Sequence, residues 1–186
     1  MDVIEAIRTR RSIRQFTDRP VAREEIEQVL DAAVLAPNHR LTQPWRFYVL
    51  GPAARQAYGE TLGSRKAKKI EDPAAAQALI DKVAASEAAL PGMIAVSMVV
   101  NENAETREED YAATMMAVQN LMLAAHAIGL GTHVKTGAVM DDARTRAAVG
   151  LPDGERIIAT VQLGEPAAMP EAKLRRTATE VTTWLP

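Results

Sequence analysis

The first third of the chain shows apolar residues at helical spacing. Val3, Ile4 and Ile7 form a short apolar stripe, which predicts a helix near the N-terminus. A second stripe over residues 26–34 predicts another helix. That helix is expected to stop at Ala36, because the proline that follows disfavours helical backbone at the residue before it.

The rest of the chain alternates apolar runs with helical patterns. Short apolar runs predict strands over residues 45–50, 93–100, 131–135 and 157–163. Helices are expected over residues 53–62, 73–89 and 110–128, together with a short one that Asp141 or Asp142 caps and that ends near residue 149. A basic stretch at 64–69 and a charged stretch at 101–109 are expected to be loops. This order predicts one α+β or three-layer α/β/α domain over residues 1–186.

The predicted long helix is unusually apolar. Residues 111–134 contain no Asp, Glu, Lys or Arg, and they are long enough to cross a bilayer. Gln119, Asn120 and His126 interrupt the stretch and Gly129 breaks its end, so a helix buried inside a protein or a subunit interface is favoured over a membrane span. A chain of this size cannot easily cover such a helix on every side. The pattern therefore predicts no membrane span, and a two-fold dimer in which the central helices pack together.

Composition narrows the class of protein. With 186 residues, 47% of them hydrophobic and 25% charged, the chain has the composition of a soluble globular domain. A formal net charge of -2 argues against general nucleic-acid binding. The absence of cysteine excludes disulfides, thiolate metal sites and cysteine nucleophiles, and it is compatible with a reducing compartment. The acidic first five residues do not match a signal peptide, so a cytoplasmic protein is expected.

Familiar catalytic motifs are absent from the sequence. It contains no glycine-rich dinucleotide loop after a strand, no Walker loop, no nucleophile-elbow serine and no His-Glu-x-x-His. The three histidines, His39, His126 and His133, have no metal-ligand spacing with carboxylates, so no metal site is expected. His126 is predicted to be a hydrogen-bonded core residue, and a structural role is favoured for His133. Because no nucleophile or acid/base pair stands out, a bound cofactor is expected to carry the chemistry.

Two basic clusters near the ends of the chain suggest anion recognition. Arg10, Ser12 and Arg14 lie within five residues, while Lys173 and Arg175 bracket one residue of a polar tail. Arginine presents a planar fork of donors that suits phosphate, and serine adds a hydroxyl. A phosphate held between the clusters would tie the C-terminal tail to the N-terminal segment. The alternative is that these cations are solvated surface.

The order of the motifs resembles the FMN-dependent nitroreductase family. Residues 10–16, Arg-Arg-Ser-Ile-Arg-Gln-Phe, look like the family's Arg-Arg-Ser-x-Arg-x-Phe opening. Residues 36–47 begin Ala-Pro-Asn-His, end Gln-Pro-Trp-Arg-Phe, and resemble the family's polar loop, in the form found in a small bacterial subgroup of NAD(P)H nitroreductases. The apolar helix ending Ala-Ile-Gly-Leu-Gly and the Lys-Leu-Arg tail follow in the family's order.

The resemblance implies a three-layer α/β/α fold with a central, mostly antiparallel sheet, in an intertwined homodimer with FMN at the interface. The FMN phosphate and ribityl side would be held by Arg10, Arg11, Ser12, Arg14, Lys173 and Arg175. The isoalloxazine would lie against the polar loop of the partner chain, at Pro37, Asn38, His39 and Gln43. The segment Val134, Lys135, Thr136 and Gly137 would pass the flavin and offer a backbone N–H to its N5 atom.

The resemblance also implies a reaction in which NAD(P)H reduces the flavin and a nitroaromatic, quinone or similar flat acceptor reoxidises it in a ping-pong cycle. His39 and Arg40 predict a pocket rim that favours an acidic or polar acceptor. Two alternatives stay open: a flavin-binding dimer without useful turnover, and an offshoot that acts on a non-nitro substrate such as an enal. The choice between NADH and NADPH also stays open, because residues 65–69 are basic enough to meet a 2′-phosphate but equally suit a solvated helix face.

Overall fold

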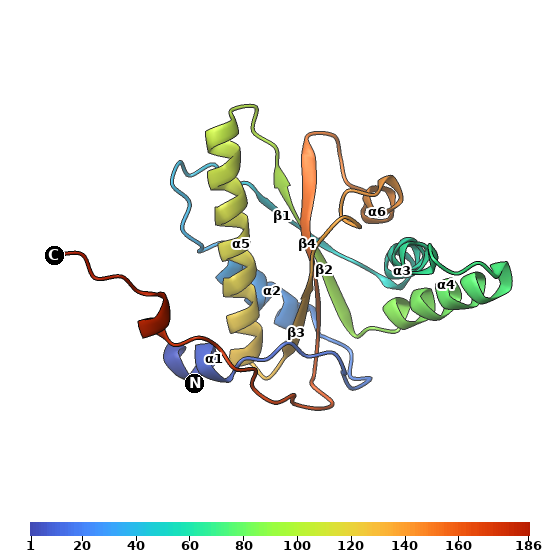
Figure 1. Ribbon diagram of the computed structural model, residues 1–186, viewed down its shortest axis with the longest axis horizontal. Helices are drawn as coiled ribbons and strands as arrows, with labels where there is room; N and C mark the ends of the chain where they lie inside the picture. The colour runs from blue at the N-terminus through green and yellow to red at the C-terminus, as the bar shows by residue number, and fades with distance from the viewer.

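The computed structural model describes residues 1–186 as a four-stranded sheet with helices on both faces (Figure 1). The strands are β1 (Trp45–Val49), β2 (Gly92–Val99), β3 (Gly131–Lys135) and β4 (Glu155–Gly164). The helices are α1 (Val3–Thr9), α2 (Arg23–Ala33), α3 (Pro52–Ala67), α4 (Pro73–Ala88), α5 (Ala104–Ala127) and α6 (Ala143–Val149), followed by a short 3-10 helix, η1 (Ala178–Val181). The predicted α+β, three-layer arrangement is confirmed.

The sheet has the order β1-β2-β4-β3, and every neighbouring pair is antiparallel. β2 and β4 lie in the middle and are buried along most of their length, because helices cover both faces. β3 is an edge strand, and its register pairs His133 with Gln162 and Lys135 with Thr160. Directly opposed residues project from the same face of a sheet, so these four side chains share one face.

One face of the sheet packs against α2 and α5. Val29 of α2, Leu121 of α5, and Val96 and Val161 of the central strands belong to one fully buried cluster. The helices supply the small and branched side chains that fill the space above the strands, and α5 runs along this face of the sheet (Figure 1).

The start of α5 differs from the prediction. Asn103 accepts a hydrogen bond from the Thr106 amide at 3.0 Å, so the helix begins at Ala104. The expectation of a loop over residues 101–109 is therefore wrong for most of that stretch. The charged side chains there occupy the first turns of the helix. The apolar pattern begins only at residue 110.

The other face of the sheet is covered by α3, α4 and α6. α3 and α4 approach closely because Gly59 and Gly63 carry no side chain: a Cβ on Gly59 would lie 2.7 Å from Ala84 Cα, and one on Gly63 2.8 Å from Ile80 Cα. The predicted loop at residues 64–69 is also wrong in part, since α3 continues to Ala67. The basic residues of its last turn interact favourably with the negative end of the helix dipole.

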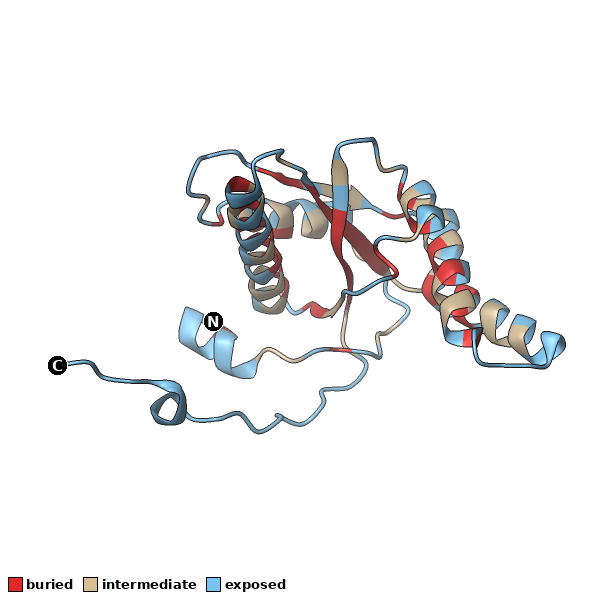
Figure 2. Ribbon diagram, turned by 45° about the horizontal axis from the view of Figure 1, so that its top comes forward, coloured by how far each residue is buried: buried red, intermediate tan, exposed pale blue.

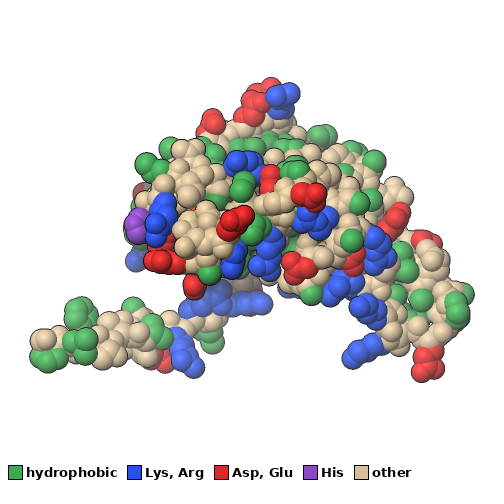
Figure 3. All heavy atoms as spheres, turned by 90° about the horizontal axis from the view of Figure 1, so that it is seen from above, with side chains coloured by type: hydrophobic (Ala, Val, Ile, Leu, Met, Phe, Trp, Pro, Cys, Tyr) green, Lys and Arg blue, Asp and Glu red, His purple; other side chains and the backbone are tan.

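Several apolar side chains are left uncovered. The stripe of α1 exists as predicted, but Ile4 and Ile7 are about half exposed. On the C-terminal tail, which extends away from the body, Trp184 and Leu185 are almost fully exposed (Figures 2 and 3). On α5, Met116 is 40% exposed. None of the helices combines the length and apolar character that crossing a membrane requires.

Candidate functional site

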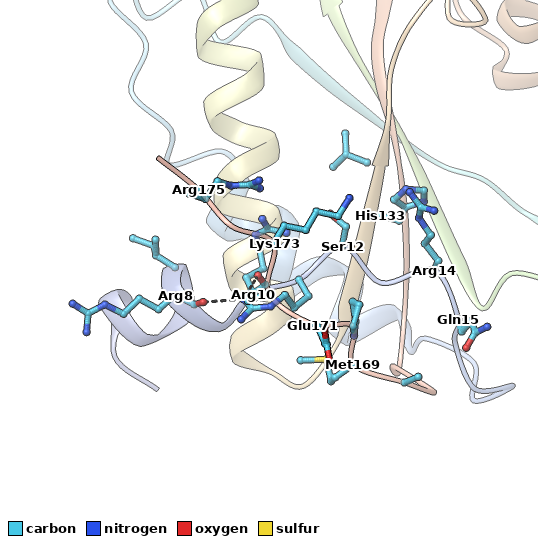
Figure 4. A pocket seen from close by; sticks show the side chains of 16 residues that line it. Arg8, Arg10, Ser12, Arg14, Gln15, His133, Met169, Glu171, Lys173 and Arg175 are labelled. Carbon is cyan, nitrogen blue, oxygen red and sulfur yellow. Dashed lines mark hydrogen bonds between the residues drawn. The ribbon is translucent and has the colours of Figure 1, made fainter. Parts of the chain in front are cut away.

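A cavity of about 920 Å³ lies where the N-terminal segment, β3 and the C-terminal tail meet (Figure 4). α1 and the segment after it contribute Ile7, Arg8, Arg10, Arg11, Ser12, Arg14 and Gln15 to its wall. β3 contributes His133 and Val134, and the tail contributes Ala168, Met169, Pro170, Glu171, Ala172, Lys173 and Arg175. Both predicted basic clusters therefore line the same cavity.

The N-terminal segment is held in an extended conformation along β3. The Ile13 amide donates to the Thr132 carbonyl at 2.9 Å, and Ile13 is buried against Gly131, where a Cβ would clash with it. Side chains alternate along extended backbone, so burial of Ile13 turns Ser12 and Arg14 outward, where both are exposed. The apolar residue in the middle of the motif thus positions the polar residues beside it.

The tail is attached to the same segment. Ala167 donates its amide to the Gln15 carbonyl at 3.0 Å, and Thr17 donates to the Glu165 carbonyl at 2.9 Å. After this short pairing, the chain runs along the cavity and carries Lys173 and Arg175 to its wall (Figure 4). The two ends of the sequence are joined by backbone hydrogen bonds.

The cavity has a strong excess of unpaired positive charge. The charged groups of Arg10, Arg14, Lys173 and Arg175 make no ion pair and no hydrogen bond within the chain. The carboxylate of Glu171 is the acidic group in the wall. Cations gathered without acidic partners repel one another, so this arrangement is favourable when an anion binds among them.

Arg11 differs from its neighbours. Its guanidinium donates to the carbonyl oxygens of Arg8 at 2.8 Å and Arg10 at 2.9 Å. These bonds satisfy carbonyls at the C-terminal end of α1, which have no partner inside the helix. Although Arg11 lines the cavity, its Nη1 donors are used to end α1.

The segment at the end of β3 divides in its contacts. Val134 lines the cavity, whereas Lys135 points to the α4 side of the sheet and forms an ion pair with the buried Glu87. Thr136 and Gly137 follow the strand and are exposed, outside the cavity wall. Their amide groups donate to no acceptor within the chain, so both N–H groups are free.

The polar loop at residues 36–44 lies elsewhere. Its contacts are with the first turns of α5, where His39 Nδ1 lies 3.0 Å from Glu109 and Arg40 donates to the same carboxylate at 3.0 Å. The cavity adjoins the other end of α5, where Thr9 bonds His126 at 2.8 Å. With a rise of 1.5 Å per residue, the two places are about 25 Å apart along the helix. Within one chain the structure does not bring Pro37, Asn38, His39 or Gln43 to the cavity.

The polar loop is nevertheless held in a defined conformation by hydrogen bonds. Asn38 Oδ1 accepts from the Gln43 amide at 2.7 Å, and its side-chain NH₂ donates to the Thr42 hydroxyl at 3.1 Å, which in turn donates to the buried Asp110. Leu41 and Gln43 have positive φ angles of 50° and 45°, a backbone conformation that residues other than glycine rarely adopt. Strained backbone of this kind persists only where surrounding contacts fix it, and it concentrates at functional loops.

The comparisons with known proteins decide the family. The model of the nitroreductase family matches residues 7–165. The chain belongs to the nitroreductase family. The protein named "Putative NAD(P)H nitroreductase YfhC" from Bacillus subtilis is 37% identical over 172 residues, which cover 91% of this chain and 87% of that one.

Solved structures agree with this nitroreductase assignment. A nitroreductase-like family protein from Bacillus cereus superposes with a TM-score of 0.86 at 28% identity, covering 100% of this chain and 96% of that one. A nitroreductase from Desulfovibrio desulfuricans, solved in complex with FMN, superposes with a TM-score of 0.75 at 28% identity, covering 100% and 98%.

Sequence reasoning about this nitroreductase missed two buried polar residues, Glu87 and Gln162. Glu87 lies in the helical region that gave the weakest sequence pattern, and Gln162 interrupts an otherwise apolar strand. A polar residue inside an apolar strand pattern is a usable signal, because a buried amide needs partners.

Burial and charge lower the pKa of two histidines near the cavity. The pKa of His133 falls chiefly because the ring is partly desolvated, with Lys135 and Arg14 adding to the effect and the bond to Gln162 opposing it. The pKa of His126 falls for the same main reason, with Arg10 and Arg11 contributing. Both rings are therefore neutral near pH 7.

Proposed function

We propose that this nitroreductase is an FMN-dependent enzyme that NAD(P)H reduces and that nitroaromatics, quinones or similar flat acceptors reoxidise. The observation that carries the proposal is the cavity in which Arg10, Arg14, Lys173 and Arg175 lack acidic partners. The nicotinamide donor is supported by the names of the related proteins, and the cofactor by the FMN complex of the Desulfovibrio structure.

The donor set in the cavity fits the phosphate end of FMN. Arginine forks and a lysine ammonium complement a phosphate dianion, and the Ser12 hydroxyl adds a neutral donor. Each charge-assisted hydrogen bond contributes about 1.5–3 kcal/mol. A cavity of about 920 Å³ is also within the size range of cofactor sites.

FMN, when bound, supplies the hydride and electron transfer, and the chain binds and orients it. The cations fix one end of the cofactor against the N-terminal segment, while Val134 offers an apolar wall on β3. The free N–H groups of Thr136 and Gly137 are available to a ligand that extends past the strand. Because Glu87 holds the Lys135 ammonium, Lys135 does not contribute its charge directly to that ligand.

We further propose that the working unit is a two-fold dimer in which the α5 helices pack antiparallel. Such a pairing places the first turns of one α5 beside the last turns of the other, and so brings the polar loop of one chain to the cavity of its partner. The exposed apolar residues Tyr111 and Met116 on α5, and Trp184 on the tail, support this arrangement because they need a covering surface.

Arg40 would reach that site with its charge already paired, and His39 with its ring already bonded. Both are bonded to Glu109, and Arg40 also lies 3.7 Å from Glu105. The rim would therefore carry little net positive charge from this loop, which weighs against the expected preference for acidic acceptors.

The test is the visible spectrum of the purified protein, followed by anaerobic titration with NADH and then NADPH. A flavin band that one reductant bleaches quickly, with colour restored by a nitroaromatic, supports the proposed function and identifies the donor. A flavin band that neither reductant changes would favour a flavin-binding dimer without turnover. Absence of flavin even after reconstitution with FMN would overturn the proposal.

A further inference from the structure

A row of hydrogen-bonded polar groups, buried at its centre, connects α4 to the wall of the cavity. Lys135 Nζ donates to Glu87 Oε1, and Gln162 Nε2 donates to Glu87 Oε2 at 2.8 Å. Gln162 Oε1 lies 3.2 Å from His133 Nδ1. Glu87 and Gln162 are each only 5% exposed, so water does not compete for the bond between them.

The direction of each hydrogen bond in this row is determined. An ionised carboxylate only accepts, so both oxygens of Glu87 are acceptors, one for the ammonium of Lys135 and one for an amide. Gln162 must therefore turn its NH₂ toward Glu87 and its carbonyl oxygen toward His133. A carbonyl oxygen only accepts, so the His133 nitrogen that faces it carries the proton.

The other ring nitrogen of His133, Nε2, has no hydrogen-bond partner in the protein. His133 is neutral near pH 7, so a proton on Nδ1 leaves Nε2 with a free lone pair. The residue lines the cavity, where Figure 4 shows it beside Arg14. Since Nδ1 is bonded to Gln162 within the sheet, Nε2 is the ring nitrogen available to a ligand.

An acceptor is scarce in this cavity. Arginine and lysine side chains only donate, so the residues that suit a phosphate cannot serve a neutral hydroxyl or N–H of the same ligand. Beside His133, the polar side chains of the wall able to accept are those of Ser12, Gln15 and Glu171. A flavin nucleotide carries both kinds of group: an anionic phosphate, and neutral donors in its ribityl hydroxyls and ring N3–H.

We propose that Glu87 and Gln162 are positioning residues that hold His133 as its Nδ1–H tautomer, so that Nε2 accepts a hydrogen bond from a neutral donor of the bound flavin. This assignment of roles rests on the proposed binding of FMN. The α3–α4 pair thereby takes part in the site. The buried carboxylate of Glu87 on α4 determines, through Gln162, which ring nitrogen of His133 donates and which accepts.

The first experiment measures the tautomer directly. Long-range ¹H–¹⁵N correlation spectra of the histidine rings are recorded for the cofactor-free protein at pH 8, with the His133→Leu variant used for assignment. We expect the Nδ1–H form for His133 in the natural protein, and a mixture of both tautomers in Gln162→Met, which keeps the volume of the side chain but removes its bonds. Glu87→Gln should act in the same way, because the new amide both donates and accepts. An Nε2–H form in the natural protein, or an unchanged tautomer in Gln162→Met, would overturn the relay.

The second experiment measures binding of FMN, riboflavin and lumiflavin by fluorescence quenching. His133→Leu should raise the Kd of FMN by about three- to tenfold, as expected for one neutral hydrogen bond, while His126→Gln should leave it unchanged. A loss shared by lumiflavin, which has no ribityl chain, assigns the contact to N3–H; a loss confined to FMN and riboflavin assigns it to a ribityl hydroxyl. An unchanged FMN Kd in His133→Leu would overturn the proposed contact. Failure of the natural protein to bind FMN would instead overturn the proposed function, and the tautomer spectra would still decide the relay.

Discussion

Two regions of this nitroreductase carry arginine side chains, and the structure leaves the charge free in one region and pairs it in the other. In the cavity at the end of α1, the charged groups of Arg10 and Arg14 have no partner within the chain. In the polar loop at residues 36–44, the charge of Arg40 is matched by Glu105 and Glu109 on α5. The N-terminal segment holds several arginines and the loop holds one, but only the distribution of acidic partners shows which of these charges is free.

This difference in pairing indicates which region can bind an anion and which region is held in one conformation by its own contacts. Cations without acidic partners remain available to an external anion, so the cavity has the properties of a phosphate site. Paired cations fix the shape of the chain that carries them, and the polar loop holds two residues at positive φ. The conformation of the loop is thus fixed within the chain, and its surface can contact another molecule. We infer that this molecule is a second copy of the chain, since the loop and the cavity lie at opposite ends of α5.

The largest expected effect comes from breaking the proposed meeting of the two regions. Met116→Glu would place a charge on the exposed face of α5, and burying an unpaired charge at an interface costs several kcal/mol. We expect the variant to be folded but monomeric by analytical ultracentrifugation, and to lose FMN when diluted.

The control for that variant is Val49→Glu, which charges an apolar residue on β1 that is 53% exposed, and this variant should remain dimeric. Met122→Glu is a poorer probe, because Met122 packs against the buried core and its substitution would also destabilise the fold. A dimeric Met116→Glu protein with bound FMN would show that the interface lies elsewhere.

The next effect separates free cations from the occupied one. Arg10→Ala and Arg175→Ala should each weaken FMN binding by about 1.5–3 kcal/mol, or roughly ten- to 150-fold in Kd, because each removes a charge-assisted phosphate contact. The measurement is fluorescence titration of the cofactor-free protein.

Arg11→Ala is the matched control, since its guanidinium ends α1 through the carbonyls of Arg8 and Arg10. It should lower the melting temperature while changing the Kd by less than either of the other variants. Equal losses for all three arginines would mean that general positive charge, rather than specific contacts, binds the cofactor.

The sequence predicted where the two regions lie, but not the contrast between free and paired cations. The strands and the long helix follow from apolar periodicity and from proline and glycine stops, which are local signals, and both motif regions were found from their polar residues and their resemblance to the family. Pairing of Arg40 with Glu109, or of Lys135 with Glu87, joins residues far apart in the chain. A charged residue looks the same in sequence whether it is paired or free, so the roles of the cations depended on the fold.

The start of α5 gives a second lesson about local signals. The run of charges after residue 103 looked like a loop because it breaks the apolar pattern, yet the Asn103 cap starts the helix there. Those turns need no apolar stripe, since their outer side holds the polar loop through Glu105 and Glu109. At this end of the helix, Glu105 and Glu109 both form part of the helical turns and hold the polar loop.

A smaller effect tests whether the loop is held by its buried anchor. Thr42→Val keeps the shape of the side chain but removes the hydrogen bond to Asp110, which is 3% exposed. Leaving a buried acceptor unsatisfied costs about 1–3 kcal/mol, so the free energy of unfolding in urea should fall by that amount.

The loop and the cavity should also separate in function in this variant. Turnover with the acceptor should decline, while the FMN Kd should rise less than in Arg10→Ala, since the loop contributes no cation to the phosphate end of the cofactor. Thr182→Val serves as a control, because that hydroxyl bonds only within the exposed tail. A strong loss of FMN binding in Thr42→Val would show that the loop and the phosphate site are energetically one region.

The smallest effect concerns the pH dependence of stability at the cavity end of α5. The pKa values of His126 and His133 are lowered from 6.5 in the folded protein, chiefly by burial, with nearby arginine and lysine charges adding to the shift. The unfolded chain therefore binds more protons than the folded one as the pH falls through 6.5. The free energy of unfolding should decrease over that window, and the histidines should contribute no further change once the pH is below their folded pKa values. Urea unfolding of the cofactor-free protein between pH 7.5 and 5 measures the slope, and the double variant His126→Gln, His133→Gln should flatten it near pH 6.5. A slope that survives in the double variant would assign the proton uptake to other groups, and would mean that the cations of the cavity do not act on these two rings.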